Sequence, residues 1–107
     1  MIKATMYWER MRLEVKGHAG FAEKGTDIVC AGASMLVQAL VGSLDVAEQR
    51  GRCEYKAKNT EDGEAIIWAF ARPGTQAEIK AYFRMCVTGL RMLQREYPTH
   101  VSVKDVE

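Results

Sequence analysis

The chain has 107 residues, enough for one hydrophobic core but too few for two, so we expect a single domain over residues 1–107. Hydrophobic residues make up 48% of the chain and charged residues 27%, a composition that argues against disordered and fibrous proteins. Fifteen basic and fourteen acidic residues leave a net charge of +1, which does not favour nucleic acid or an anionic membrane as a partner.

The N-terminal segment alternates apolar and polar residues, unlike a signal peptide, and no apolar run approaches the roughly 20 residues that span a bilayer. We therefore expect a cytoplasmic protein with no membrane partner. The three cysteines, Cys30, Cys53 and Cys86, form no CxxC pair, which fits neither a disulfide framework nor a zinc knuckle. In a reducing compartment each cysteine should remain a thiol.

The first expected elements are two strands over residues 2–8 and 11–16, in which apolar and polar residues alternate, joined by a two-residue turn. After a glycine-containing loop, Asp27 is a good N-cap for a long helix that should end near Gly51. The apolar residues of this helix recur at helical spacing: Val29, Ala33, Leu36, Leu40 and Leu44.

A second strand pair is expected over residues 52–58 and 64–72, because the five residues between them are rich in turn formers and end in Gly63. The later strand has apolar residues at both alternating positions, including Trp68 and Phe70. This pattern predicts a strand in the centre of the sheet that is covered on both faces.

The second helix should begin at Thr75, which with Glu78 makes a capping box, and end before Pro98. Its apolar stripe is Ile79, Phe83, Cys86, Leu90 and Leu93. A short strand is expected within residues 99–107. The predicted order is therefore ββαββαβ, an α+β fold with two long helices on a mainly antiparallel sheet.

The chemistry-bearing stretch is residues 17–34, where His18 and Cys30 flank the glycine-containing loop. A cysteine attacks carbonyl groups as the thiolate, which a helix N-terminus or a neighbouring histidine favours. Counted from an Asp27 cap, Cys30 stands at the third helical position, where free backbone N–H groups could also donate to an oxyanion. The loop could bring the imidazole of His18 to the sulfur, or act as a lid.

The other cysteines fit the core, because Cys53 alternates with Tyr55 in a strand and Cys86 belongs to a helical apolar stripe. From spacing alone, Cys30 is also compatible with a small buried side chain and His18 with a solvated one. A metal site built from His18, Cys30 and His100 would lack the closely spaced ligand pair of zinc motifs, so no metal is expected.

The residues GHAG followed by DIVCAGAS resemble the bacterial ribosomal-processing cysteine protease family, Prp. Its pattern, a Gly-His-Ala element, then Gly-x-Asp-x-Val-Cys and a serine four positions after the cysteine, is matched by Gly17, His18, Ala19, Gly25, Asp27, Val29, Cys30 and Ser34. The order of elements and the chain length also agree with the family. One departure is Gly32, where the family usually has alanine.

The resemblance implies a protease that removes a short N-terminal extension from large-subunit ribosomal protein number twenty-seven, without metal or organic cofactor. Cys30 would be the nucleophile and His18 the base. Asp27 would either orient His18 or only cap the helix, and both roles stay open. Gly17 and Ser34 would support the site, Ser34 from one helical turn beyond the cysteine.

The resemblance also implies a homodimer, and the apolar residues Trp68 and Phe70 would suit either a helix layer or a subunit interface. The family's peptide substrate needs an apolar groove, for which the candidate wall residues are Trp8, Phe21, Tyr82 and Phe83. Two alternatives remain. One is a non-catalytic module that holds a ribosomal protein or assembly factor in the same cleft, and the other, less favoured, is a thiol redox sensor.

Overall fold

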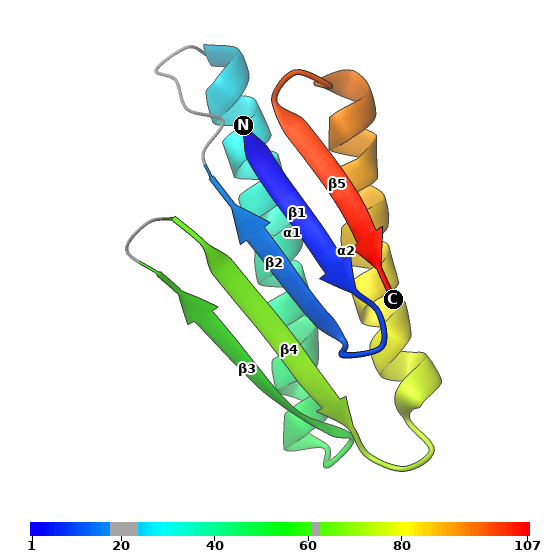
Figure 1. Ribbon diagram of the computed structural model, residues 1–107. Helices are drawn as coiled ribbons and strands as arrows, with labels where there is room; N and C mark the ends of the chain where they lie inside the picture. Colours follow the sequence, from blue (N-terminus) through cyan, green and yellow to red (C-terminus); the bar gives the residue numbers. More distant parts are fainter. Residues whose placement is uncertain (18–23, 61–62) are drawn as a thin grey trace.

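The computed structural model describes residues 1–17, 24–60 and 63–107, with the side chains of the first helix described from residue 28 onward. The elements follow in the order β1 (Ile2–Tyr7), β2 (Arg12–Lys16), α1 (Lys24–Gln49), β3 (Cys53–Asn59), β4 (Ala65–Ala71), α2 (Gln76–Glu96) and β5 (Val101–Val106) (Figure 1). This order confirms the predicted ββαββαβ arrangement and the α+β class.

The five strands form one sheet in the spatial order β3-β4-β2-β1-β5. The pairs β1–β2, β2–β4 and β3–β4 are antiparallel, whereas β1 and β5 are parallel, with Ile2 opposite Val101. The parallel pair requires a long connection between its strands, and α2 with its flanking turns brings the chain back to the far edge. The sheet is thus mainly antiparallel, as predicted.

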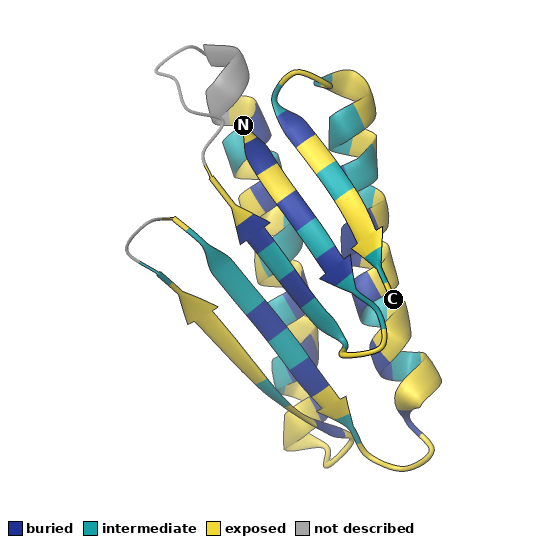
Figure 2. Cartoon of the chain, in the orientation of Figure 1, coloured by how far each residue is buried: buried dark blue, intermediate teal, exposed yellow. Residues whose placement is uncertain are grey.

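Both helices pack on the same face of the sheet, and the core lies between these two layers (Figures 1 and 2). Alternate strand residues point toward the helices, such as Ile2, Ala4 and Met6 in β1, which are all buried. The largest fully buried side chains come from both layers: Phe83, Met6, Leu13, Leu44, Ile67, Ile79 and Leu90. The predicted apolar stripes of both helices therefore face the core.

The connection between β1 and β2 is longer than predicted. Tyr7 pairs with Arg12, so four residues rather than two form the loop, and Met11 has a positive φ of 49°. Neither Glu9 nor Arg10 is a residue that favours the positive φ angles of a two-residue hairpin turn, which accounts for the longer connection.

The predicted start of the first helix and the predicted capping box of the second are wrong. Helix α1 begins at Lys24, so Asp27 lies inside its first turn and not at the N-cap. Helix α2 has Thr75 at its N-cap position, but no side-chain capping bond forms. The Thr75 hydroxyl instead donates to the carbonyls of Arg52 and Arg72, at 2.7 and 2.8 Å, and the carboxylate of Glu78 pairs with Arg52.

Strand β4 is an interior strand, paired with β3 on one side and β2 on the other, as predicted. The described helices cover one of its faces and not both, which corrects the second part of that prediction (Figure 1). Ile67 and Ala69 are buried under the helices, whereas Phe70 is 59% exposed on the opposite face. Trp68 shares that outer face, where the guanidinium of Arg12 lies 5.4 Å from its ring centroid. A helix layer over Trp68 and Phe70 is thereby excluded.

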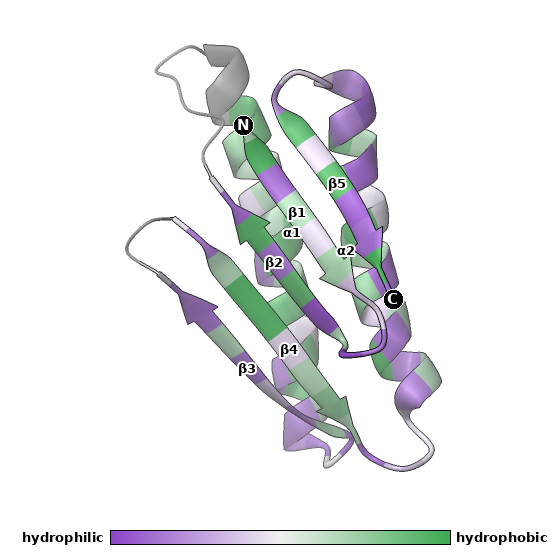
Figure 3. Cartoon of the chain, viewed as in Figure 1, coloured by the Kyte–Doolittle hydropathy of each residue, from purple (hydrophilic) through white to green (hydrophobic). Residues whose placement is uncertain are grey.

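The segment Ile28–Gln49 of α1 is long and apolar enough to span a membrane, with a mean hydropathy of 1.6. The expectation from the sequence was that no apolar run reaches that length. The segment reaches it because no charged residue lies between Ile28 and Leu44. Hydrophobic residues occur along much of the described part of this helix (Figure 3). In the fold, the same helix covers the sheet through Val29, Leu40 and Leu44, which are buried.

Candidate active site

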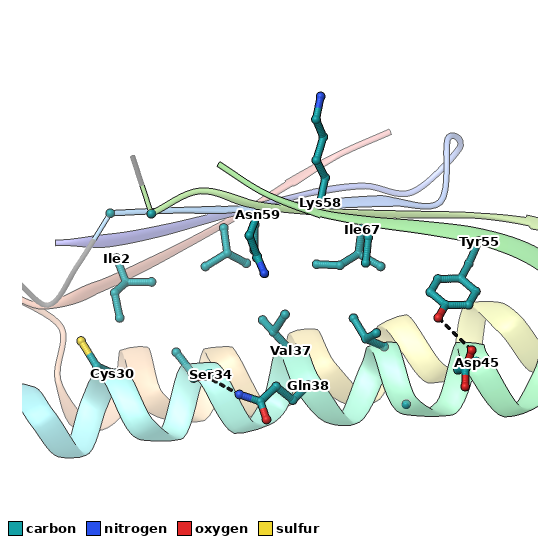
Figure 4. A pocket seen from close by; sticks show the side chains of 18 residues that line it. Ile2, Cys30, Ser34, Val37, Gln38, Asp45, Tyr55, Lys58, Asn59 and Ile67 are labelled. Carbon is teal, nitrogen blue, oxygen red and sulfur yellow. Dashed lines mark hydrogen bonds between the residues drawn. The ribbon is translucent and has the colours of Figure 1, made fainter. Parts of the chain in front are cut away.

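A cleft of about 760 Å³ lies between α1 and the sheet (Figure 4). One wall is a line of α1 residues, and the other is formed by the inner side of β3 and β4 with the neighbouring parts of β1 and β2. Aliphatic side chains cover much of both walls, among them Val37 and Val41 from α1 and Ile2, Val15 and Ile67 from the sheet. A cleft of this size and lining is typical of ligand sites in proteins.

Cys30 lies at one end of this cleft. It is half-buried in the second turn of α1, and its Sγ projects toward the sheet near Ile2 (Figure 4). Cys53 and Cys86 are buried in the core, as predicted. Burial raises the pKa of the Cys86 thiol to about 12 and also raises the pKa of Cys53. Among the three cysteines, Cys30 alone lines the cleft.

Ser34 lines the cleft one helical turn beyond Cys30, on the same side of α1, as the spacing predicted. Its Oγ accepts a hydrogen bond of 2.9 Å from the side-chain amide of Gln38 (Figure 4). The hydroxyl can still donate a hydrogen bond of its own. A polar group therefore follows the thiol along the α1 wall.

Gly17 also lines the cleft, at the end of β2. It has a φ of 87°, and a Cβ built on it would lie 2.4 Å from the carbonyl oxygen of Met1. Both observations require glycine here, because other residues avoid this φ and no Cβ fits that close to backbone. Backbone geometry therefore accounts for glycine at this position of the cleft, and the supporting role of Gly17 in the chemistry stays a prediction.

The position of His18 lies outside the described residues, as does the side chain of Asp27. The backbone start of α1 at Lys24 places Cys30 one turn further into the helix than an Asp27 cap would. The unbonded N–H groups of the first turn thus belong to residues that precede Cys30. The free N–H groups that were expected to stabilise a thiolate and an oxyanion at Cys30 therefore do not belong to the turn in which Cys30 lies.

The opposite end of the cleft is formed by Asp45 of α1 and Tyr55 of β3. The phenol of Tyr55 donates a 3.0 Å hydrogen bond to Asp45 Oδ1, which joins helix and sheet (Figure 4). The backbone N–H of Tyr55 donates to Glu48, also at 3.0 Å. The hydrogen bond from Tyr55 to Asp45 is the main cause of the raised pKa of the phenol.

Sequence reasoning missed Asp45 and Tyr55 as cleft residues. The signal was present in α1, because positions 30, 34, 37, 41 and 45 recur at helical spacing and share one side of the helix. Of the predicted wall aromatics, Trp8, Tyr82 and Phe83 do not line the cleft, and Phe21 lies outside the described residues. Phe83 is instead fully buried in the core.

Within the described part of the chain, no three His, Cys, Asp or Glu side chains are grouped as a metal site would require. Among the described residues, polar side chains that line the cleft are Cys30, Ser34, Gln38, Asn59 and the Tyr55–Asp45 pair, whereas the side chain of Lys58 points away from α1 (Figure 4). A thiol at the end of an aliphatic cleft can attack the carbonyl carbon of a peptide held there, once a base has taken its proton.

The chain matches the family model described as cysteine protease Prp over residues 1–102. It is 28% identical to the ribosomal processing cysteine protease Prp of Bacillus subtilis, with 96% of each chain covered.

Solved structures share the fold. SMU.848 from Streptococcus mutans matches with a TM-score of 0.78 and 29% identity, over 99% of this chain and 94% of the other. The essential ribosomal processing protease Prp from S. aureus, in complex with a covalently linked product peptide, matches with a TM-score of 0.74 and 22% identity, over 98% and 99% of the chains. The S. aureus protease has also been solved with a substrate peptide, and that structure matches with a TM-score of 0.74 and 21% identity, over the same shares.

Proposed function

The chain belongs to the cysteine protease Prp family, and from this premise we propose that it removes the short N-terminal extension of large-subunit ribosomal protein number twenty-seven. The family establishes a cysteine protease of the ribosomal-processing kind. The identity of the substrate and the roles of individual residues are the proposal.

The observation that supports this function best is the position of Cys30. It lies at the end of a cleft of about 760 Å³ whose walls are largely aliphatic, and the other two thiols are buried away from solvent. An extended peptide can lie along such a cleft with its scissile carbonyl next to the sulfur.

In the proposed mechanism, His18 takes the proton of the Cys30 thiol, and the thiolate attacks the scissile carbonyl carbon. The C–N bond then breaks, and the imidazolium of His18 gives its proton to the departing amine. A water molecule, deprotonated by His18, attacks the resulting thioester, and the C–S bond breaks to restore the thiol. Asp27 would orient His18, whereas Gly17 and Ser34 would shape the wall around the sulfur.

The test is mass spectrometry of the extended ribosomal protein after incubation with the wild type, Cys30→Ala and His18→Ala. We expect one internal cut by the wild type, none by Cys30→Ala, and a loss nearly as large in His18→Ala, since members of a catalytic unit act together. Cys53→Ala, measured below its unfolding temperature, is the control that should retain the cut. An intact substrate that binds the wild type would favour the non-catalytic binding module.

We also propose that the protein acts in the cytoplasm as a homodimer, as the family resemblance implies. The outer sheet face with Trp68 and the exposed Phe70 is a candidate interface. Light scattering after gel filtration should give twice the chain mass for the wild type and for Met85→Glu on the helix face. Phe70→Glu should give the mass of one chain, and a dimeric Phe70→Glu would place the interface elsewhere.

A further inference from the structure

The cleft extends along α1 from Cys30 to Asp45, and its length limits what it can hold. Fifteen residues separate these two positions, which at about 1.5 Å per residue places them about 22 Å apart along the helix axis. An extended peptide advances about 3.3 Å per residue, so about six or seven substrate residues fit between the two ends.

The end of the cleft opposite Cys30 is closed by a bridge between the two layers. The Tyr55 phenol donates to Asp45, and the Cys53 thiol directs a weak hydrogen bond of 3.7 Å to the carbonyl of Leu44. A peptide that extends from Cys30 along the cleft meets this bridge. The geometry therefore suits a chain terminus better than a peptide that continues in both directions.

The charge at the closed end selects between the two kinds of terminus. Among the described residues that line the cleft, Asp45 is the one acidic side chain, and it forms no ion pair with another described residue. Within the described part of the lining, Lys58 is the one basic residue, and its ammonium group points away from α1 (Figure 4). A carboxylate at the end of a largely aliphatic cleft attracts an ammonium group and repels a terminal carboxylate.

The hydrogen bonds of Asp45 leave room for a ligand. Oδ1 accepts from Tyr55 and Oδ2 accepts from the side-chain amide of Gln49, both through neutral donors. An ionised carboxylate has about four acceptor positions, so both oxygens retain capacity.

We propose that Asp45 binds the free α-amino group of the substrate, so that the bond placed at Cys30 lies about six or seven residues from the substrate's N-terminus. This proposal rests on the proposed function and adds a specificity residue at the far end of the same cleft. Asp45 touches the end of the substrate and not the reacting atoms. It therefore acts on substrate affinity and on the choice of bond.

The test measures binding to the Cys30→Ala protein, so that it does not depend on cleavage. Fluorescence anisotropy compares the extension peptide with a free amine, the same peptide N-acetylated, and a peptide shortened by three residues from its N-terminus. We expect acetylation to weaken binding to Cys30→Ala about tenfold, the order of a charge-assisted hydrogen bond. The shortened peptide should show no amine preference, because its amine does not reach Asp45.

The second variant is Cys30→Ala with Asp45→Asn, which keeps an acceptor for Tyr55 and removes the charge. Its preference for the free amine should fall below twofold. The matched control, Cys30→Ala with Glu48→Gln, removes a charge one turn away that does not line the cleft and should keep the preference.

The assignment would be overturned if acetylation weakened binding equally in Cys30→Ala and in Cys30→Ala with Asp45→Asn. It would also be overturned if none of the peptides bound to Cys30→Ala. Amine-dependent binding without cleavage by the wild type would instead contradict the proposed function and leave the Asp45 site standing.

Discussion

Gly17 and Gly74 form a matched pair for testing how the backbone at the cleft is held. Both have a φ of 87°, but a Cβ on Gly74 meets nothing within 4 Å, whereas one on Gly17 lies 2.4 Å from the carbonyl oxygen of Met1. Gly74→Ala therefore measures the cost of the φ angle alone, about 1–2 kcal/mol of unfolding free energy. Gly17→Ala adds a collision with backbone, for which overpacking typically costs about 1–3 kcal/mol more.

The assay is urea unfolding at 25 °C, supported by thermal melts. With an unfolding entropy of about 2.1 cal/mol/K per residue, each kcal/mol lowers the melting temperature of a chain of this size by about 4 °C. We expect Gly17→Ala to melt several degrees below Gly74→Ala, with unchanged m-values. Equal losses in the two variants would show that the approach of Gly17 to Met1 is not a constraint, and the structural argument for glycine at the cleft would fail.

Three further outcomes are expected. Phe83→Ala should cost about 3–5 kcal/mol of unfolding free energy, because Phe83 is fully buried. Met85→Ala, at a residue that is 77% exposed, should cost under about 0.5 kcal/mol. Urea unfolding measures both, and similar losses in the two variants would contradict the packing described for α2. Iodoacetamide at pH 8 should alkylate Cys30 well before Cys53 and Cys86 in the native protein, and equal rates read by peptide mapping would count against an accessible Cys30. Because the folded-state pKa of Cys86 is about 12 against an ordinary 9.0, its neutral thiol contributes stability fully below about pH 9 and loses it as pH rises toward 12, by up to about 1.4 kcal/mol per pH unit. Cys86→Ala should remove this part of the pH dependence, and identical slopes for Cys86→Ala and the wild type would refute it.

The fold could be predicted from the sequence where apolar periodicity is strong. Helix α2 and the β3–β4 hairpin were placed within a few residues, because helical or alternating patterns continue up to clear turn signals. The start of α1 was misplaced because Asp27 is a good N-cap residue, yet the helix extends back to Lys24. The capping box failed because the Thr75 hydroxyl donates to the carbonyls of Arg72, which is local, and of Arg52, which only the folded chain brings near.

The site could be predicted only in part. Cys30, Gly17 and Ser34 were named from the motif, and the structure places all three in the cleft. The cleft's far end depends on the pairing of Asp45 with Tyr55, ten residues apart across the α1–β3 turn, which no local pattern signals. Strand β4 was expected to be covered on both faces because its apolar residues, including Phe70, occupy both alternating positions. In the fold Phe70 lies on the open face, and composition alone does not say which apolar face stays uncovered.

The central claim is that Cys30 is the thiol that attacks a peptide held in the cleft. The most direct measurement is mass spectrometry of the wild type after reaction with an extension peptide that carries a thiol-reactive electrophile in place of the scissile bond. We predict one adduct per chain, mapped to Cys30, and competition by the unmodified extension peptide. An adduct on Cys53 or Cys86, or modification that the unmodified peptide does not slow, would contradict the account.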